Sequence, residues 1–340
     1  AIRRLIKQVA EQIRDEEAAR ERESGGSRRV EVLFCEVDGL WTTLQRGRGK
    51  RCGRRRREVK QATVHEGWRV RQGKGRERDY ALLNPTHHCS LEESGEGFWE
   101  GLRAKLAARY AELDRTLIVI NGDGAEWIRE GEGHFGQVMR QRDRFHIKRE
   151  LMRVLKGHPE RLGRAREALD TNDIAGVLAE LEEAERESKD PRKAEELRRA
   201  REDWVGDREA IADYRVRLKD AGVRVKPHWR GLGAAESNVD RFKNRIGKRG
   251  RSWSREGLDA ILTALCKLYE GTLPDYVRRL GTKVELPEVQ QLRTGAGELV
   301  TKRVDRSLGA VRRGHFPALD HGTRGFAELF KALIRVEPVW

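Results

Sequence analysis

The chain has 340 residues, of which 37% are hydrophobic and 37% charged, so a buried core is possible but not generous. Its 71 lysines and arginines exceed its 56 aspartates and glutamates, and the net charge of +15 indicates a polyanionic partner, nucleic acid before an anionic membrane surface. No apolar run approaches the roughly 18 residues that a membrane-spanning helix needs, and no secretory signal is visible, so we expect no membrane partner.

The first third of the chain predicts one helix and then mostly strands. Residues 1–23 carry apolar side chains at helical spacing, and the Ser-Gly-Gly-Ser sequence over 24–27 ends the helix. Residues 29–38 predict a strand, and 41–44 pair back onto it after a turn at Asp38-Gly39. The next elements are expected to be a basic loop over 46–57, a third strand over 58–70 and a helix over 98–113.

Beyond residue 114, a short strand precedes a long helical stretch. The strand over 115–120 is strongly apolar and ends in Asn121-Gly122-Asp123-Gly124, a turn that exposes the aspartate. Residues 146–220 are highly charged and helical in pattern. The other expected elements are a short helix over 125–130, strands over 138–145 and 223–225, and helices over 233–246, 255–269 and around 326–333.

Three acidic residues stand where a fold can present a carboxylate on a fixed backbone. Asp38 ends the first predicted strand, Asp123 ends the fourth between two glycines, and Glu236 lies near the start of a helix. Carboxylates that converge in this way can hold two Mg²⁺ or Mn²⁺ ions, a pair that suits in-line phosphoryl transfer. The alternative is that they are solvated surface charges and that Asp38-Gly39 is only a turn. Glu36, on the same strand face as Asp38, is a rival for its role.

Several short sequences resemble the motifs of one enzyme family. Val37-Asp38-Gly39 resembles the first motif of ribonuclease-H-like DDE transposases, and 121–125 followed by Trp127-Ile128 resembles the second. Asp143-Arg-Phe-His146 is similar to the C/D-x-x-H signature of Mutator-like and related bacterial transposases, and Ala235-Glu236-Ser-Asn238 resembles the third motif. The sequences over 57–60, 64–68 and 251–254 are similar to those of ISLre-type insertion-sequence transposases.

The resemblance implies an α/β fold: a ribonuclease-H-like mixed five-stranded sheet with flanking helices and a large all-helical insertion. It divides the chain into an N-terminal helix, the first part of the catalytic core, the helical insertion, the last part of the core and a C-terminal helical extension, at 1–28, 29–146, 147–230, 231–270 and 271–340. Asp38, Asp123 and Glu236 would be the catalytic metal ligands, and Asp143 and His146 would lie adjacent to the site.

The activity that the resemblance implies is that of a polynucleotidyl transferase. Such an enzyme cleaves DNA and transfers strands at insertion-sequence ends with two Mg²⁺ or Mn²⁺ ions. Its partners would be double-stranded DNA, as transposon ends and as target, and further copies of the chain in a homo-oligomer. The corresponding location is the bacterial cytoplasm, at the nucleoid.

Basic residues near two of the motifs are candidate DNA contacts, because lysine and arginine bind the phosphate backbone whatever its sequence. The candidates are Lys243, Arg245, Lys248, Arg249 and Arg251, on and after the helix of Glu236, and Arg54, Arg55, Arg56 and Arg57 in the basic loop. For the loop, the alternative is a solvated hairpin. Trp253 is either a stacking platform for an unpaired base or a core residue.

Other interpretations stay open. A different ribonuclease-H-like nuclease, such as a junction resolvase or an RNA–DNA hybrid nuclease, would share the carboxylates, and a truncated or domesticated DNA-binding protein would share only the charge. Asp143 and His146 are alternatively a surface aspartate and a half-buried histidine at a helix start. The cysteines lack CxxC spacing, which favours a reducing cytoplasm, and His87-His88 beside Cys89 has no second ligand pair for a metal.

Overall fold

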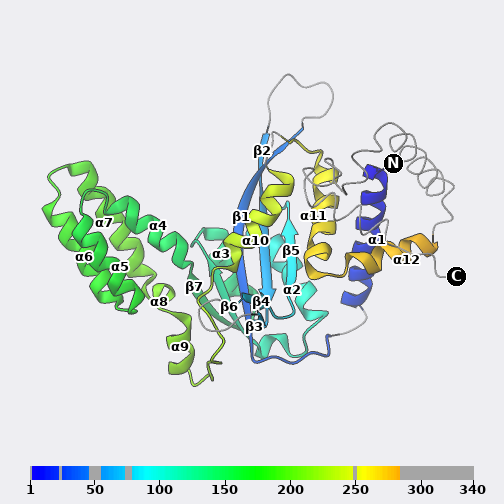
Figure 1. Cartoon of the computed structure of the whole chain (residues 1–340), viewed down its shortest axis with the longest axis horizontal. Helices are drawn as coiled ribbons and strands as arrows, with labels where there is room; N and C mark the ends of the chain where they lie inside the picture. Colours follow the sequence, from blue (N-terminus) through cyan, green and yellow to red (C-terminus); the bar gives the residue numbers. More distant parts are fainter. Residues whose placement is uncertain (1, 23–24, 46–54, 73–78, 248–250, 284–340) are drawn as a thin grey trace, which may run out of the picture. The chain divides into compact units, whose positions relative to one another are not determined.

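The computed structural model (Figure 1) describes residues 2–22, 25–45, 55–72, 79–247 and 251–283. The chain falls into two compact units, each built from separate stretches of sequence. Unit 1 comprises Ala1–Arg22, Trp41–Arg57 and Arg241–Trp340, and unit 2 comprises Glu23–Leu40 and Glu58–Asp240.

A five-stranded mixed sheet in the order β5-β2-β1-β6-β7 organises unit 2. Its strands are β1 (Val32–Leu44), β2 (Arg55–His65), β5 (Thr86–Ser90), β6 (Leu117–Gly122) and β7 (Gln137–Arg142), and the last residues of β1 and the first of β2 belong to unit 1. β2 and β5 are antiparallel, whereas β1 and β7 both run parallel to β6 between them. The expected α/β fold with a mixed five-stranded sheet is therefore confirmed.

One face of this sheet packs against α2 (Gly95–Ala107). Leu33 of β1 and Ile118 of β6 are fully buried against Phe98 and Trp99 of this helix. Ser94 starts the helix, because its hydroxyl accepts the backbone N–H of Gly97. Successive side chains of a strand point to opposite faces, so the residues that alternate with this apolar set must face the other side.

The opposite face is covered by aromatic residues from other parts of unit 2. These come from the hairpin of β3 (Trp68–Gln72) and β4 (Asp79–Leu82), from α9 (Tyr214–Asp220) and from the segment before α10. The Phe34 ring of β1 lies at their centre, with ring centroids 5.1 Å from Trp68 and 5.0 Å from Trp229. Because β1 continues without a break, Glu36 and Asp38 face the same side as Phe34.

Between β7 and the end of α9 the chain, described throughout, is mostly helical, as its charged sequence predicts. The helices are α4 (Arg144–Val154), α5 (Pro159–Asp170), α6 (Ile174–Glu187), α7 (Pro191–Gly206), α8 (Arg208–Ile211) and α9. Figure 1 shows α4 to α7 gathered in one bundle, and their shared core includes Leu151, Leu181, Leu197 and Trp204. Apolar spacing on one side of each helix thus builds a second core, apart from that of the sheet.

Helices make up most of what the structure describes of unit 1. α1 (Ile2–Arg22) packs with α11 (Arg255–Glu270) and α12 (Leu273–Lys283), and Ile13, Ala264 and Tyr276 are buried among them. α10 (Ala234–Ile246) begins in unit 2 and ends in unit 1. The helices expected over 1–23, 233–246 and 255–269 are confirmed. Among the residues that the structure describes, none of the helices is long and apolar enough to span a membrane.

Two predictions for the first strands are wrong. β1 does not turn at Asp38-Gly39 but continues to Leu44, so Asp38 lies within a strand rather than at its end. Gly39 leaves room for a neighbour instead of making a turn, since a Cβ there would lie 2.3 Å from Glu58 Oε1. The strand expected over 58–70 is two strands, because Gly67, with φ of +111°, separates β2 from β3.

Smaller differences concern the ends and the number of elements. β4 and β5 were not expected, and 223–225 forms no strand. The predicted helix over 98–113 ends at Ala107, and a 3₁₀ turn over Leu113–Arg115 leads into β6. β7 ends at Arg142, because Asp143 already caps α4. The amphipathic helix expected around 326–333 lies outside the described residues.

Candidate active site

The parallel pairing of β1 with β6 brings two of the predicted carboxylates to one level of the sheet. Residues from Val32 opposite Leu117 to Glu36 opposite Asn121 are in register, so Asp38 and Asp123 each follow the last pair by two positions. Asp38 is half-buried and its Oδ1 accepts the N–H of Gly39 at 2.7 Å, whereas Asp123 is exposed. Neighbouring parallel strands therefore present both aspartates at the same edge.

The turn after β6 fixes the backbone at Asp123. The carboxylate Oδ1 accepts the N–H of Ala125 at 2.9 Å, immediately before the short helix α3 (Glu126–Arg129). A side chain at Gly122 has no room, since a Cβ would lie 2.8 Å from Ile128 Cδ1, and Gly124 has φ of +91°. The tight turn expected from the two glycines is confirmed.

Asp143 and His146 lie beside this turn. The backbone N–H of Asp143 donates to the Gly122 carbonyl at 2.8 Å, which ties the end of β7 to the end of β6. The Asp143 carboxylate caps α4 by accepting the N–H groups of Phe145 at 2.8 Å and His146 at 3.2 Å. Asp143 is only 4% exposed, so it is not a surface aspartate, and His146 is a half-buried histidine at a helix start.

The charges around His146 show which acidic residues gather there. Its Nδ1 lies 3.5 Å from Asp143 Oδ1, and this contact is the main reason why the pKa of His146 is raised. Burial opposes the shift, while the charges of Asp143, Asp38 and Asp123 add to it. Burial alone would raise the pKa of Asp143, but interactions with His146 and Asn121 outweigh it and lower that pKa. The two sheet aspartates and the Asp143–His146 pair thus share one electrostatic neighbourhood.

A buried polar cluster lies next to Asp38 on β1. The Glu36 side chain is fully buried; its Oε1 lies 3.1 Å from His65 Nε2, and its Oε2 accepts Asn121 Nδ2 at 3.4 Å and the backbone N–H of Gly233 at 2.8 Å. Asn121 Nδ2 also donates to Asp143 Oδ2 at 2.9 Å. Sequence reasoning considered Glu36 only as a rival metal ligand and gave no role to His65 or to the Asn121 side chain. Glu36 and Asn121 could have been noticed as polar residues in otherwise apolar strands, whereas His65 ends a strand that is mostly polar and gave no such signal.

Glu236, the third predicted carboxylate, lies in the first turn of α10, and its side chain is outside the described part. The backbone of Gly233, three residues earlier, is held by Glu36. The start of α10 is therefore fixed on the face of the sheet that also carries Asp38. Lys243 lies on the same helix and is exposed, as a DNA contact requires.

The other predicted DNA-binding residues are distributed over unit 1. Arg245 is half-buried near the end of α10, and Arg251 donates to its backbone carbonyl. Arg56 lies over the Trp41 ring at 5.4 Å from the centroid and Arg57 is half-buried. Arg55 to Arg57 belong to β2 rather than to the basic loop. The side chain of Arg55, and the whole of Arg54, Lys248 and Arg249, lie outside the described part.

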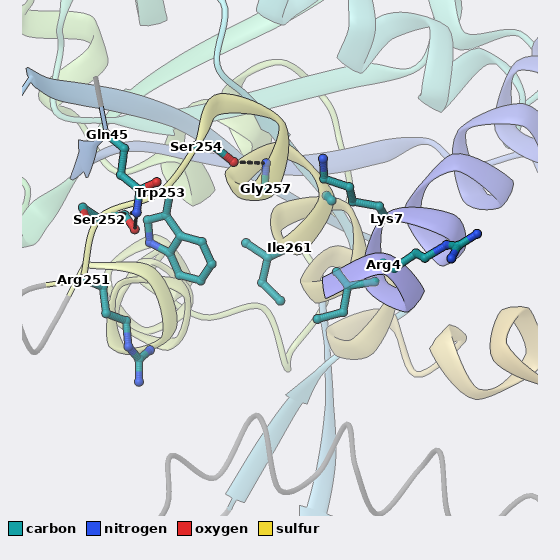
Figure 2. A pocket seen from close by; sticks show the side chains of 11 residues that line it. Arg4, Lys7, Gln45, Arg251, Ser252, Trp253, Ser254, Gly257 and Ile261 are labelled. Atoms are coloured by element: carbon teal, nitrogen blue, oxygen red, sulfur yellow. Dashed lines mark hydrogen bonds between the residues drawn. The ribbon is translucent and has the colours of Figure 1, made fainter. Parts of the chain in front are cut away.

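A cavity of about 770 Å³ lies between the first turns of α1, the 251–254 segment and the start of α11 (Figure 2). Trp253 lines it as a half-buried residue, with its indole N–H donating to the Ile246 carbonyl at 2.8 Å. The ionisable side chains among its lining residues are all cations: Arg4, Lys7 and Arg251. The hydrogen bond to Ile246 thus holds Trp253 at one edge, while its ring borders a hollow lined by cations.

The two rings of the histidine pair on β5 lie in different surroundings. His87 Nδ1 lies 3.1 Å from the Thr63 hydroxyl, whereas the His88 ring packs 5.2 Å from the ring of Phe98. Adjacent residues of a strand point to opposite faces, so these two rings cannot converge. In the part of the chain that the structure describes, no three His, Cys, Asp or Glu side chains are grouped to hold a metal. The Glu236 side chain is not among the described side chains.

The chain thus combines a mixed sheet, which carries Asp38 and Asp123, with a group of helices that follows β7. The model of UPF0236, an uncharacterised protein family, matches residues 1–283, so the chain belongs to this family. The family description gives no activity.

Similar proteins come from two bacteria. A UPF0236 protein of Caldanaerobacter subterraneus subsp. tengcongensis is 23% identical over 291 residues, which cover 86% of this chain and 57% of that protein. A second protein of that organism, whose name joins eleven locus labels, is 23% identical over 291 residues and is covered to 56%. The UPF0236 protein "in vanSb 3'region" of Streptococcus gallolyticus is 27% identical over 257 residues, 74% of this chain and 52% of that protein. The chain spans about half the length of the curated relatives it matches.

Proposed function

We propose that this chain carries the catalytic core of a DDE-type DNA transposase with a ribonuclease-H-like fold, which cleaves DNA and transfers strands at insertion-sequence ends. The observation that carries the proposal is the meeting of Asp38 and Asp123 on neighbouring parallel strands, close enough that both charges act on His146. The mixed sheet, the helical insertion after β7 and the return of the chain in α10 support the same fold.

The donor set fits a pair of hard divalent cations. Asp38 and Asp123 offer carboxylate oxygens, which Mg²⁺ and Mn²⁺ prefer, and Glu236 is on a helix whose start is fixed on the same face. Among the described residues Asp123 forms no ion pair that would compete with a metal. Bound ions would activate the attacking water or 3′-hydroxyl and stabilise the leaving oxygen.

The residues around the carboxylates have tasks of their own in this proposal. Gly122 and Gly124 allow the tight turn that presents Asp123, because Ile128 and Arg142 occupy the places where their side chains would lie. Asp143 accepts the backbone N–H of His146 at the start of α4 and so holds this histidine beside the carboxylates. Lys243, Arg56 and the cationic hollow with Trp253 would contact DNA phosphates in unit 1.

The name of one relative gives the proposal independent support. A single protein that bears eleven locus labels of one organism is what a mobile element present in many copies would produce. Insertion-sequence transposases multiply in this way, whereas a cellular junction resolvase or hybrid nuclease has no reason to. The eleven locus labels therefore favour a transposase over the other ribonuclease-H-like nucleases.

A cleavage assay tests the proposal. Supercoiled plasmid and labelled insertion-sequence ends are incubated with the protein and Mg²⁺ or Mn²⁺, beside Asp123→Asn and the charge-matched control Asp220→Asn, an exposed residue at the end of α9. We expect metal-dependent nicking and joining, lowered by roughly 100-fold or more in Asp123→Asn and unchanged in the control.

The same assay separates the alternatives. Cleavage without joining of any end would favour another nuclease of this fold. DNA binding with no cleavage, identical in Asp123→Asn, would contradict the proposal and indicate a basic DNA-binding protein.

A further inference from the structure

Glu36 is a charged residue in a place where packing alone would favour an apolar one. It lies between Cys35 and Val37, both fully buried, and is itself 1% exposed. Burying a carboxylate costs several kcal/mol in order-of-magnitude terms unless donors surround it. Its oxygens do meet donors, since His65, Asn121 and the backbone of Gly233 all reach it. A carboxylate enclosed in this way is built into the fold for a reason other than the core.

The hydrogen bonds of the cluster fix the orientation of the Asn121 side-chain amide. Asn121 lies between two carboxylates, those of Glu36 and Asp143, and only its amide nitrogen can donate to both. If the amide were flipped, its oxygen would face the carboxylates of both Glu36 and Asp143. Asn121 therefore couples the middle of β1 to the cap of α4, and with it to His146.

The contact with Gly233 reaches the other end of the site. Gly233 is the last residue before α10, and Glu236 follows in the first turn of that helix. Its N–H donates to Glu36 Oε2 at 2.8 Å, a bond that a negative charge strengthens. Between α9 and Ala234 the chain forms neither a strand nor a helix, so the hydrogen bonds of regular secondary structure do not hold this segment. The Glu36 bond is thus a specific link between β1 and the start of α10.

We propose that Glu36 is a positioning residue: it holds the start of α10, the helix that carries Glu236, and through Asn121 it holds Asp143 and His146. This inference rests on the proposed function, because the carboxylates that it aligns are the proposed metal ligands. Glu36 itself is too deeply buried to touch DNA, and its oxygens are occupied by donors from three other segments of unit 2. It acts through the residues it holds.

Glu36→Gln tests the link with little change in volume. A glutamine replaces one carboxylate oxygen with an NH₂ group, which leaves a neutral amide oxygen as the one acceptor for Asn121 and Gly233 and requires His65 to accept rather than donate at Nε2. The matched control is Glu66→Gln, another buried carboxylate of unit 2, which binds Arg28, Asn84 and Tyr110 instead. Both variants remove a buried carboxylate, but only Glu36→Gln replaces the acceptor of the Gly233 N–H with a neutral amide oxygen.

Two measurements on the whole chain test whether Glu36 holds the start of α10. Hydrogen exchange followed by mass spectrometry reports on the Gly233 amide, which we expect to exchange about 10-fold faster in Glu36→Gln, because its acceptor changes from a carboxylate to a neutral amide oxygen. The Mg²⁺ concentration that gives half-maximal DNA cleavage should rise by about 10- to 100-fold, and Mn²⁺ should restore part of the activity. Glu66→Gln should change neither quantity.

The outcomes have separate meanings. Wild-type exchange and wild-type Mg²⁺ dependence in Glu36→Gln would overturn the inference, as would equal changes in both variants, which would indicate general destabilisation. If the wild-type protein cleaves no DNA under any condition, the proposed function fails, whereas the exchange of the Gly233 amide still shows whether Glu36 holds the start of α10.

Discussion

The end of the sheet in unit 2 that carries Glu36, Asp38, Asn121, Asp123, Asp143 and His146, here called the sheet edge, and the helical bundle α4–α7 are both rich in charge. The sheet edge buries much of its charge, whereas the bundle carries many of its charges on its surface. At the sheet edge, Glu36 and Asp143 are nearly inaccessible and their oxygens are met by particular donors. On the bundle, pairs such as Arg198 with Glu195 have side chains 45% and 37% exposed. Water already solvates such exposed pairs, so they add little to stability, whereas a buried carboxylate depends on its donors.

The comparison teaches where function and stability should be sought. In the bundle the charges lie outside a core of leucines, valines and a tryptophan, and that core holds the helices together. At the sheet edge, the polar residues themselves are inside. Substitutions should therefore be costly at buried polar positions of the edge and at apolar positions of the bundle, and nearly neutral at the charges on the bundle surface.

The largest stability effect is expected for Asn121→Asp. A third carboxylate between Glu36 and Asp143 removes both donated hydrogen bonds and adds like charge, so we expect a loss of about 3 to 5 kcal/mol in the free energy of unfolding, measured with urea. Asn172→Asp is the matched control. The Asn172 side-chain oxygen accepts from the backbone N–H of Asp213 and from Arg144, and a carboxylate keeps both bonds. Equal losses in the two variants would remove the distinction between the regions.

Leu197→Ala tests the bundle core. Leu197 is fully buried in the cluster that includes Leu181 and Trp204, so the cavity left behind should cost about 2 to 3 kcal/mol in urea denaturation. DNA cleavage at a temperature well below the midpoint should be unaffected. A loss of cleavage without a loss of stability would assign the bundle a part in the reaction.

The ionisation of His146 sharpens the description of the sheet edge. Its pKa should lie above 6.5, the usual value, mainly through Asp143 and further through Asp38 and Asp123. Titration by NMR should show the largest decrease in Asp143→Asn, a smaller one in Asp123→Asn, and a decrease on addition of Mg²⁺, which offsets the aspartate charges. The contribution to stability follows from the sign: it is fully present below the unfolded pKa and is lost as the pH rises through the raised folded pKa. A His146 pKa insensitive to Asp123→Asn would contradict the proposed convergence.

The smallest effect is expected on the bundle surface. Arg198→Ala removes the contacts with Glu195 and Glu202, all of them on exposed side chains of α7. We expect no resolvable change in melting temperature by calorimetry, with or without added salt. A clear loss of stability would show that the surface charges of the bundle do form a stabilising network.

Local patterns predicted the parts of the fold that depend on nearby residues. The helices of unit 1 and of the bundle follow from apolar spacing, and the turn after β6 follows from Gly122 and Gly124. The boundary errors have local causes of a kind that a pattern does not display. Gly39 looks like a turn glycine, yet its lack of a side chain serves Glu58 on the neighbouring strand.

The candidate site was only partly readable because its contacts are distant in sequence. Asp38, Asp123, Asp143 and His146 were found from motifs, but how they are held was not. Glu36 meets partners that are 29, 85 and 197 residues away, which no spacing rule connects. β5 was missed for the same reason, since its place beside β2 depends on pairing rather than on its own sequence.

Diffraction from crystals grown with Mn²⁺, recorded at the manganese absorption edge, tests the central claim most directly. The account predicts anomalous peaks within bonding distance of the carboxylates of Asp38, Asp123 and Glu236, about 2.0 to 2.3 Å from their oxygens, which are lost in crystals of Asp123→Asn. Manganese bound elsewhere, or a Glu236 carboxylate turned away from the two aspartates, would contradict it.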